Sequence, residues 1–113
     1  MTPDDKELIQ LAARAFFGSE DEATHAIVSL GWNPKDNNED AFMLAAWLGI
    51  EFRTWGAHDG ASAHGGKALP GQRHVSPYRY HRHVYRLNSD MYVAARRAIL
   101  EVAAEIGRDT YAQ

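Results

Sequence analysis

The pattern of hydrophobic and polar positions predicts a helix at each end of the chain. Residues 3–17 repeat leucine, alanine and phenylalanine at the spacing of one helical face, and Gly18 is placed to end that helix. From about residue 89 to Gly107 a second stripe recurs at the same spacing, opposite a charged face. The inward stripe consists of Ala95, Ile99, Val102 and Ile106, and the outer, ion-pairing face consists of Arg97, Glu101, Glu105 and Arg108.

The middle of the chain contains an apolar helix followed by an alternating strand. Asn38 suits an N-cap, and the run AFMLAAWLG is apolar on all sides, which predicts a largely buried helix ending at Gly49. Trp47 is therefore expected to pack in the core. Residues 50–55 then alternate as in a half-buried strand. One side of this strand carries Ile50, Phe52 and Thr54, and the other carries Glu51, Arg53 and Trp55.

Residues 19–31 fit two different structures. Ser19 and Glu22 suit the capping box of a short helix that ends at Gly31. Residues 25–30 contain β-branched side chains and suit a strand equally well. Periodicity does not decide between a helix and a strand over so few residues.

The segments that follow complete an α+β fold. Residues 56–77 are rich in glycine and histidine and contain little to bury, which predicts a long loop. Residues 78–87 carry aromatic and branched side chains typical of a strand. We therefore expect a single domain over residues 1–113, in which a small antiparallel sheet packs against three helices. A sheet this small is marginally stable alone, so self-association as a homo-oligomer is also expected.

Composition narrows the class of protein further. With 113 residues there is room for one core. The chain contains no cysteine, no apolar run of the ~20 residues that cross a bilayer, and no signal-peptide pattern at its start. These features predict a cytoplasmic protein without a membrane partner.

Charge is distributed unevenly along the chain. Residues 1–55 carry ten acids and four bases, whereas residues 56–87 carry one acid, Asp59, against five bases and five histidines. This asymmetry is typical of an anion-binding face. It is equally compatible with two halves that complement each other across the fold or across a dimer.

Catalytic and metal chemistry find little support in the sequence. His81 and His83 would share one side of a strand, and a loop histidine such as His58 could complete a metal site. However, no cysteine accompanies them, and histidines in polar loops are more often solvated. No nucleophile elbow, zincin spacing or carboxylate pair is present. We therefore predict no catalytic residue, no metal and no cofactor, and if turnover occurred His81 or His83 would supply the base.

The loop segment GASAHGGKA, residues 60–68, resembles a phosphate-binding loop only superficially. A P-loop ending at Gly66 and Lys67 requires glycine at position 61 and a hydroxyl at position 68, and both positions are alanine. The sequence therefore excludes a P-loop NTPase but leaves open contact between an anion and the glycine amides.

The stretch YRYHRHVYR, residues 78–86, is the candidate contact surface. Its aromatic rings and guanidiniums suit stacking on bases and pairing with phosphates, although the pI of about 6.0 disfavours nucleic acid. Arg, Tyr and Trp are also the residues that dominate protein interfaces. A solvated strand whose arginines pair with the acidic N-terminal half is an equally open reading. The predicted contact residues are Trp55, His64, Lys67, Arg73, Tyr78, Arg79, Tyr80, Arg82, Tyr85 and Arg86.

Two segments resemble a family of small phage and prophage proteins of unknown function. The first begins with Trp32-Asn33-Pro34 and an acidic turn and continues as Asp40-Ala41 and the helical run LAAWLGI. The second is the helical sequence AARRAI followed by AAEIG, over residues 94–107. The resemblance implies a phage setting and a mixed helix–sheet fold. It covers about half of the chain and leaves out residues 56–87.

These observations together favour an accessory protein that acts by binding. The leading prediction is a non-enzymatic phage or prophage protein in the host cytoplasm, which binds a host protein or complex and antagonises host defence in the manner of an anti-CRISPR protein. A pocket that sequesters a small anionic ligand such as a nucleotide is the alternative. Nucleic acid is the less favoured partner.

Overall fold

The structure, a computed structural model, describes residues 3–54, 60–65, 80–84 and 91–111. These residues form four helices and three strands, in agreement with the expected α+β class. The elements are α1 Pro3–Phe17, α2 Glu20–Leu30, α3 Asn38–Leu48, β1 Ile50–Thr54, β2 Ala61–Gly65, β3 His81–Val84 and α4 Met91–Tyr111.

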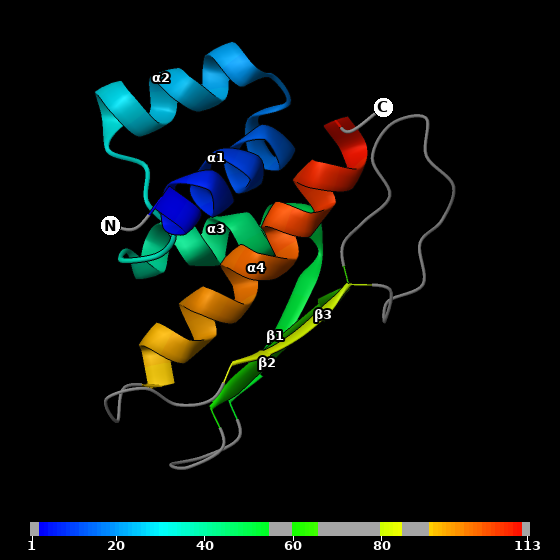
Figure 1. Cartoon of the computed structure of the whole chain (residues 1–113). Coiled ribbons are helices and arrows are strands. Elements are labelled where there is room, and N and C mark those ends of the chain that lie inside the picture. The colour runs from blue at the N-terminus through cyan, green and yellow to red at the C-terminus, as the bar shows by residue number, and fades with distance from the viewer. Residues whose placement is uncertain (1–2, 55–59, 66–79, 85–90, 112–113) are drawn as a thin grey trace.

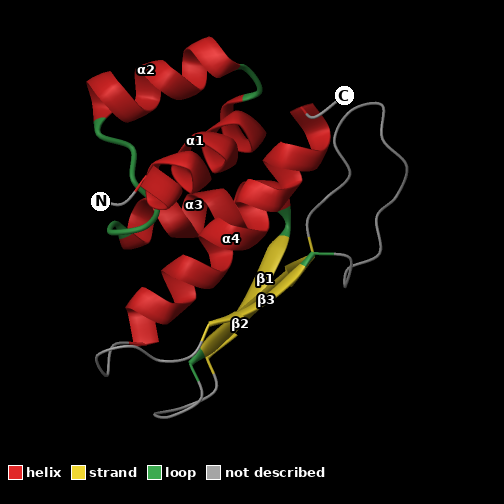
Figure 2. Ribbon diagram, viewed as in Figure 1, coloured by secondary structure: helices red, strands yellow, loops and turns green. Residues whose placement is uncertain are grey.

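Helix α4 lies at the centre of the molecule (Figure 1). The sheet packs against one side of α4, and α1 packs against the other. Helix α3 lies beside α4 and also contacts β1. Helix α2 packs on α1 at the side of the molecule farthest from the sheet (Figure 2). The helices thus cover one face of the sheet, and no described helix lies on its other face.

The contact between α1 and α4 is built from small residues. Ala12, Ala13 and Ala103 are fully buried in one core cluster. At Gly107 a Cβ atom would lie 2.1 Å from the backbone oxygen of Leu11, so only glycine permits this approach. The sequence predicted that Gly107 ends the helix; instead α4 continues to Tyr111, because the glycine serves helix packing rather than helix termination. The four residues predicted as its inward stripe are all buried.

Residues 19–31 adopt the helical alternative. The Ser19 hydroxyl accepts a hydrogen bond from the backbone N–H of Glu22 at 3.2 Å, which caps the first turn of α2. Gly31 follows with φ of 70°, in the left-handed conformation that ends many helices. These two local signals, rather than the apolar pattern, determine the structure of the segment.

Helix α3 forms where the sequence predicts it, but its predicted burial is wrong. Asn37 rather than Asn38 caps the helix, and its side-chain oxygen accepts from the backbone N–H of Asp40 at 2.9 Å. One face, formed by Ala41, Leu44, Ala45 and Leu48, is buried. Phe42, Met43 and Trp47 are 62%, 52% and 54% exposed. Trp47 is therefore not a core residue: it lies outside the buried face of α3, and its ring contacts that of Phe16 in α1 with 6.1 Å between centroids.

The three strands form one antiparallel sheet in the order β1-β2-β3. β1 lies within the predicted strand, but only Ile50 is buried; Phe52 is 44% exposed because β1 lies at the sheet edge. β2, the central strand, lies inside the segment predicted as a loop. Its Ala61 packs with Ala94 and Ala95 of α4, so small residues fill the narrow space between helix and sheet.

Ion pairs connect α4 to its neighbours. The Arg97 guanidinium lies 2.5 Å from Asp5 of α1 and 3.0 Å from Glu101 one turn along α4. Partial burial acts to lower the pKa of Arg97, but the hydrogen bonds and charges of the two carboxylates outweigh this effect and raise it. Arg82 of β3 pairs with Glu105 of α4. Ion pairing is thus confirmed at Arg97, Glu101 and Glu105, but the prediction of an outer face is wrong, because Arg97 meets α1 and Glu105 meets β3.

Candidate binding surface on the open face of the sheet

The register of the strands brings six polar residues together on the face of the sheet that the helices leave open. Arg82 pairs with Glu105 of α4, so Arg82 points toward the helices. By alternation His81 and His83 point away from them. Residues paired across neighbouring strands point to the same face of a sheet. The register pairs His81 with His64 and then Glu51, and it pairs His83 with Ser62 and then Arg53. We call the open face the set formed by Glu51, Arg53, Ser62, His64, His81 and His83.

One row of the open face runs across all three strands as Glu51, His64 and His81. The His64 Nε2 lies 3.1 Å from a Glu51 carboxylate oxygen. On its other side the His64 ring stacks on the His81 ring, with 6.4 Å between centroids and 26° between planes. The Glu51 side chain remains 81% exposed, whereas that of His64 is 25% exposed. The central imidazole is therefore held in position by both neighbours.

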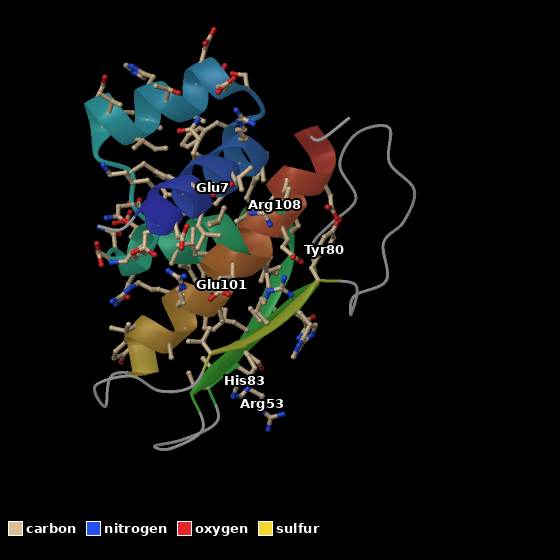
Figure 3. All side chains as sticks on the ribbon, in the orientation of Figure 1. Glu7, Arg53, Tyr80, His83, Glu101 and Arg108 are labelled. Atoms are coloured by element: carbon tan, nitrogen blue, oxygen red, sulfur yellow. The ribbon has the colours of Figure 1, made fainter. Side chains whose placement is uncertain are left out.

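The second row consists of Arg53, Ser62 and His83. Arg53 and His83 are exposed and lie on the side of the sheet away from α4 (Figure 3). Ser62 is only 5% exposed because it lies on the central strand between larger side chains. Its hydroxyl, the one hydroxyl of the open face, is accordingly poorly placed to attack a substrate.

The open face does not form a metal centre in this structure. Among the described residues, no group of three or more histidine, aspartate or glutamate side chains is arranged to hold a metal ion. His64 and His81 stack on each other, and a shared ion would instead require their nitrogens to converge.

Among the residues that the structure describes, no helix is long and apolar enough to span a bilayer.

Three of the predicted contact residues fall within the described residues, and they do not lie on one common surface. His64 lies on the open face. Arg82 lies on the helix side with Glu105, so the predicted internal pairing of this arginine is realised with the C-terminal helix and not with the acidic N-terminal half. Tyr80 is 6% exposed and donates a hydrogen bond from its hydroxyl to Asp109 at 3.0 Å. Burial removes its ring from the surface and gives it a structural role.

The other predicted contact residues lie outside the described residues: Trp55, Lys67, Arg73, Tyr78, Arg79, Tyr85 and Arg86. Sequence reasoning missed Arg53 and Glu51 as members of a surface. The alternation of residues 50–55 already placed both opposite Ile50. What the sequence lacked was the position of β2, which joins these residues to the histidines of β3.

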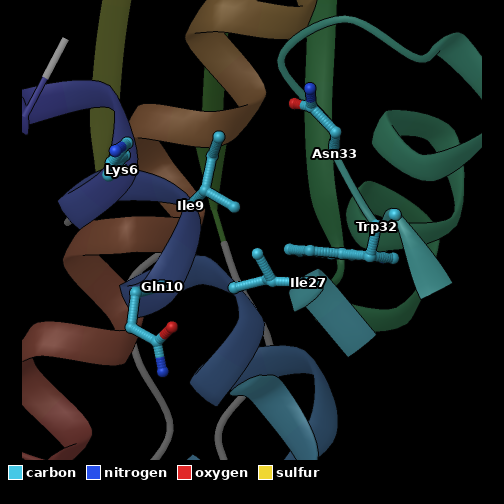
Figure 4. Close-up of a pocket in the computed structure, with 7 residues that line it drawn as sticks. Lys6, Ile9, Gln10, Ile27, Trp32 and Asn33 are labelled. Carbon is cyan, nitrogen blue, oxygen red and sulfur yellow. The ribbon is translucent and has the colours of Figure 1, made fainter. Parts of the chain in front are cut away.

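A cleft on the opposite side of the molecule offers a different kind of site. It lies between α1, the end of α2 and the turn that follows, with a volume of about 410 Å3 (Figure 4). Ile9, Ile27 and Trp32 supply apolar walls, and Lys6 is its one cationic side chain. The Asn33 amide is already hydrogen-bonded to Asp36 at 3.0 Å. The described residues that line the cleft include no acid–base pair and no cluster of cations, so they do not match the predicted anion pocket.

Comparison with known proteins leaves the chain without a relative to guide the assignment. No protein-family model matches it, and searches of curated proteins and of solved structures give no significant match.

Proposed function

We propose that the protein acts by non-enzymatic binding of a host protein through the open face, as a phage or prophage accessory protein that antagonises host defence. The observation that carries the binding role is the asymmetry of the sheet. Helices α3 and α4 cover one face, while the other displays Arg53 and three imidazoles. The phage setting and the anti-defence role rest on the resemblance of residues 32–50 and 94–107 to small phage proteins.

The side chains of the open face favour a polar, hydrogen-bonding contact surface on the partner. The open face carries one carboxylate, Glu51, which lies against His64. Its remaining ionisable side chains are one guanidinium and three imidazoles, in a chain whose formal net charge is −3. Arg53 and Glu51 cancel in formal charge, so the open face offers a partner hydrogen-bonding guanidinium and imidazole groups rather than a net charge.

Binding is favoured over catalysis by the shape and contents of the open face. The Ser62 hydroxyl is buried, and the clefts described for this molecule are not lined by residues of the open face. Catalytic sites instead gather an accessible nucleophile and a base within a cavity. A flat surface of mixed polar groups suits contact with another macromolecule.

A pair of matched variants tests the proposal. His81→Glu/His83→Glu places two carboxylates on the open face, whereas His25→Glu/Arg108→Glu adds at least as much negative charge to exposed positions on α2 and α4. Immobilised wild-type protein and the control should capture the same host protein from lysate, and the open-face variant should not. Calorimetry with the purified partner should give the same order of affinities.

The anti-defence role needs a separate measurement. Plaque formation on a host with an active defence system should rise when the wild type or the control is expressed, and not when the open-face variant is expressed. If the open-face variant retains both capture and plaque formation, the open face is not the contact surface. If the purified protein releases a nucleotide on denaturation and captures no protein, the small-ligand alternative replaces the proposal.

A further inference from the structure

The outer edge of β1 presents backbone groups that no strand of the described residues pairs. In the order β1-β2-β3, β1 has a neighbour on one side. The Gly65 N–H donates to the Tyr80 carbonyl at 3.0 Å, so Gly65 directs its backbone groups toward β3. Its partner across the other register, Ile50, therefore directs its own groups away from β2. Because this direction alternates along a strand, Phe52 and Thr54 also present their N–H and C=O groups to the outer edge.

The sequence of β1 is self-complementary about its middle residue. In an antiparallel pair of two copies centred on Phe52, each Glu51 faces the Arg53 of the partner copy, and each Arg53 faces the partner's Glu51. Phe52 then meets its own equivalent as a hydrogen-bonded pair, with Ile50 and Thr54 opposite each other on either side. All three pairs use the outward backbone groups derived above.

An apolar groove adjoins the same edge. It has a volume of about 210 Å3 and is lined by Phe42 of α3, Phe52 of β1, and Tyr92, Ala95 and Ile99 of α4, among others. Phe42 and Tyr92 are 62% and 67% exposed. A second Phe52 beside the first would extend this apolar surface and remove it from water.

We propose that the chain forms a two-fold symmetric dimer by antiparallel pairing of β1 with β1 of a second copy, which creates a continuous six-stranded sheet. The edge of β3 is a poorer candidate, because antiparallel pairing centred on Arg82 places Arg82 opposite Arg82 and His81 opposite His83, while pairing centred on His83 places His83 opposite itself and brings no opposite charges together. Pairing through β1 joins backbone groups that no described strand pairs, opposite charges and apolar rings in one register. An isologous contact of this kind closes at two copies.

This inference does not rest on the proposed function. His81 and His83 lie on β3, which β2 separates from β1, so the open-face variant leaves the pairing edge intact. Dimerisation and partner capture can therefore fail independently of each other.

Charge exchange across the two-fold axis provides the test. In Glu51→Arg every cross-strand pair becomes arginine against arginine, and in Arg53→Glu every pair becomes glutamate against glutamate. Sedimentation equilibrium should show a dimer for the wild type and a dissociation constant raised about tenfold or more for each variant. An equimolar mixture of the two variants restores both opposite-charge pairs, so native mass spectrometry should show the heterodimer as the main dimeric species.

Asp21→Arg, on the exposed surface of α2, is the matched control and should leave the dimer unchanged. Circular dichroism establishes that each variant is folded. The proposal is overturned if the wild type is monomeric at every concentration reached, if neither single variant weakens the dimer, or if the mixture forms no more heterodimer than either variant forms homodimer.

Discussion

The α1–α4 interface and the open face of the sheet lie on opposite sides of α4 and are made of opposite kinds of residue. At the interface, alanines and Gly107 bring two helix backbones into close contact. On the open face, polar side chains from three strands stand next to one another, and those of Glu51, Arg53, His81 and His83 are exposed to water. At Gly107 the interface has no room for an added Cβ atom. The open face has room for a different side chain at its exposed positions.

The contrast separates residues that maintain the fold from surface residues at which a partner could make contact. A tightly packed interface loses free energy of unfolding with any change of volume. An exposed position away from caps and buried networks changes the free energy of unfolding little when it is substituted. The three predictions below test this division from its most sensitive position to its least sensitive.

Gly107→Ala should produce the largest loss of stability. Inside an ordinary helix this substitution stabilises by roughly 0.5–1 kcal/mol. Here the new Cβ would lie 2.1 Å from the Leu11 backbone oxygen, and no side-chain rotation can relieve the overlap. We expect the free energy of unfolding to fall by about 3 kcal/mol, measured by urea denaturation at one fixed protein concentration.

Arg108→Ala, at the neighbouring exposed position, is the control for this measurement and should change the free energy of unfolding by less than about 0.5 kcal/mol. If Gly107→Ala proves neutral or stabilising, the helices are not in the close contact described, and the contrast between the two regions is lost.

Tyr80→Phe should have an intermediate effect. The substitution keeps the buried ring but removes the hydroxyl that donates to Asp109 at 3.0 Å. Because Asp109 is exposed and can be hydrated instead, the expected loss is about 1 kcal/mol. Thermal and urea denaturation would measure it.

A double-mutant cycle with Asp109→Ala isolates the pair from other contacts of either residue. The two substitutions should be non-additive, with a coupling energy close to the loss seen in Tyr80→Phe. Fully additive effects would mean that the Tyr80 hydroxyl does not connect the start of β3 to α4.

How far the sequence predicts this structure depends on the kind of signal in each segment. The first helix, the position of α3 and the inward stripe of α4 follow directly from helical periodicity and caps. Such signals depend on residues close together in the sequence and do not depend on the tertiary arrangement. The boundaries at Gly18, Gly31 and Gly49 are likewise set by glycines with positive φ.

The central strand could not be predicted in the same way. Its sequence, ASAHG, contains two alanines and a glycine, which are depleted in strands, and no β-branched residue. It is a strand because Ala61 and Ala63 leave room for α4 above them, and that requirement depends on a helix far along the chain. The same dependence explains the error at Trp47, whose exposure is decided by which side of α3 meets α1 and α4.

The candidate surface was predicted in part for a related reason. A run of tyrosines, arginines and histidines identified the right strand, but alternation alone did not show which side faces α4. Arg82 and Tyr80 turn toward the helices, while His81 and His83 turn away. Once β2 is placed, Arg53 and Glu51 of β1 join the histidines on one face of the sheet.

His81→Glu/His83→Glu should have the smallest effect on stability and so mark the other end of the comparison. Both side chains are exposed, and glutamate at each position points into water beside other polar groups. We expect the free energy of unfolding to change by less than about 0.5 kcal/mol, close to the value for the control His25→Glu/Arg108→Glu.

A loss as large as that of Tyr80→Phe would instead show that the imidazoles stabilise the sheet, since the His64–His81 stack would then contribute to folding. In that case reduced partner capture by the open-face variant would reflect instability. The binding role would then have to be tested with His83→Glu alone, since His83 is exposed and takes no part in the stack of imidazoles.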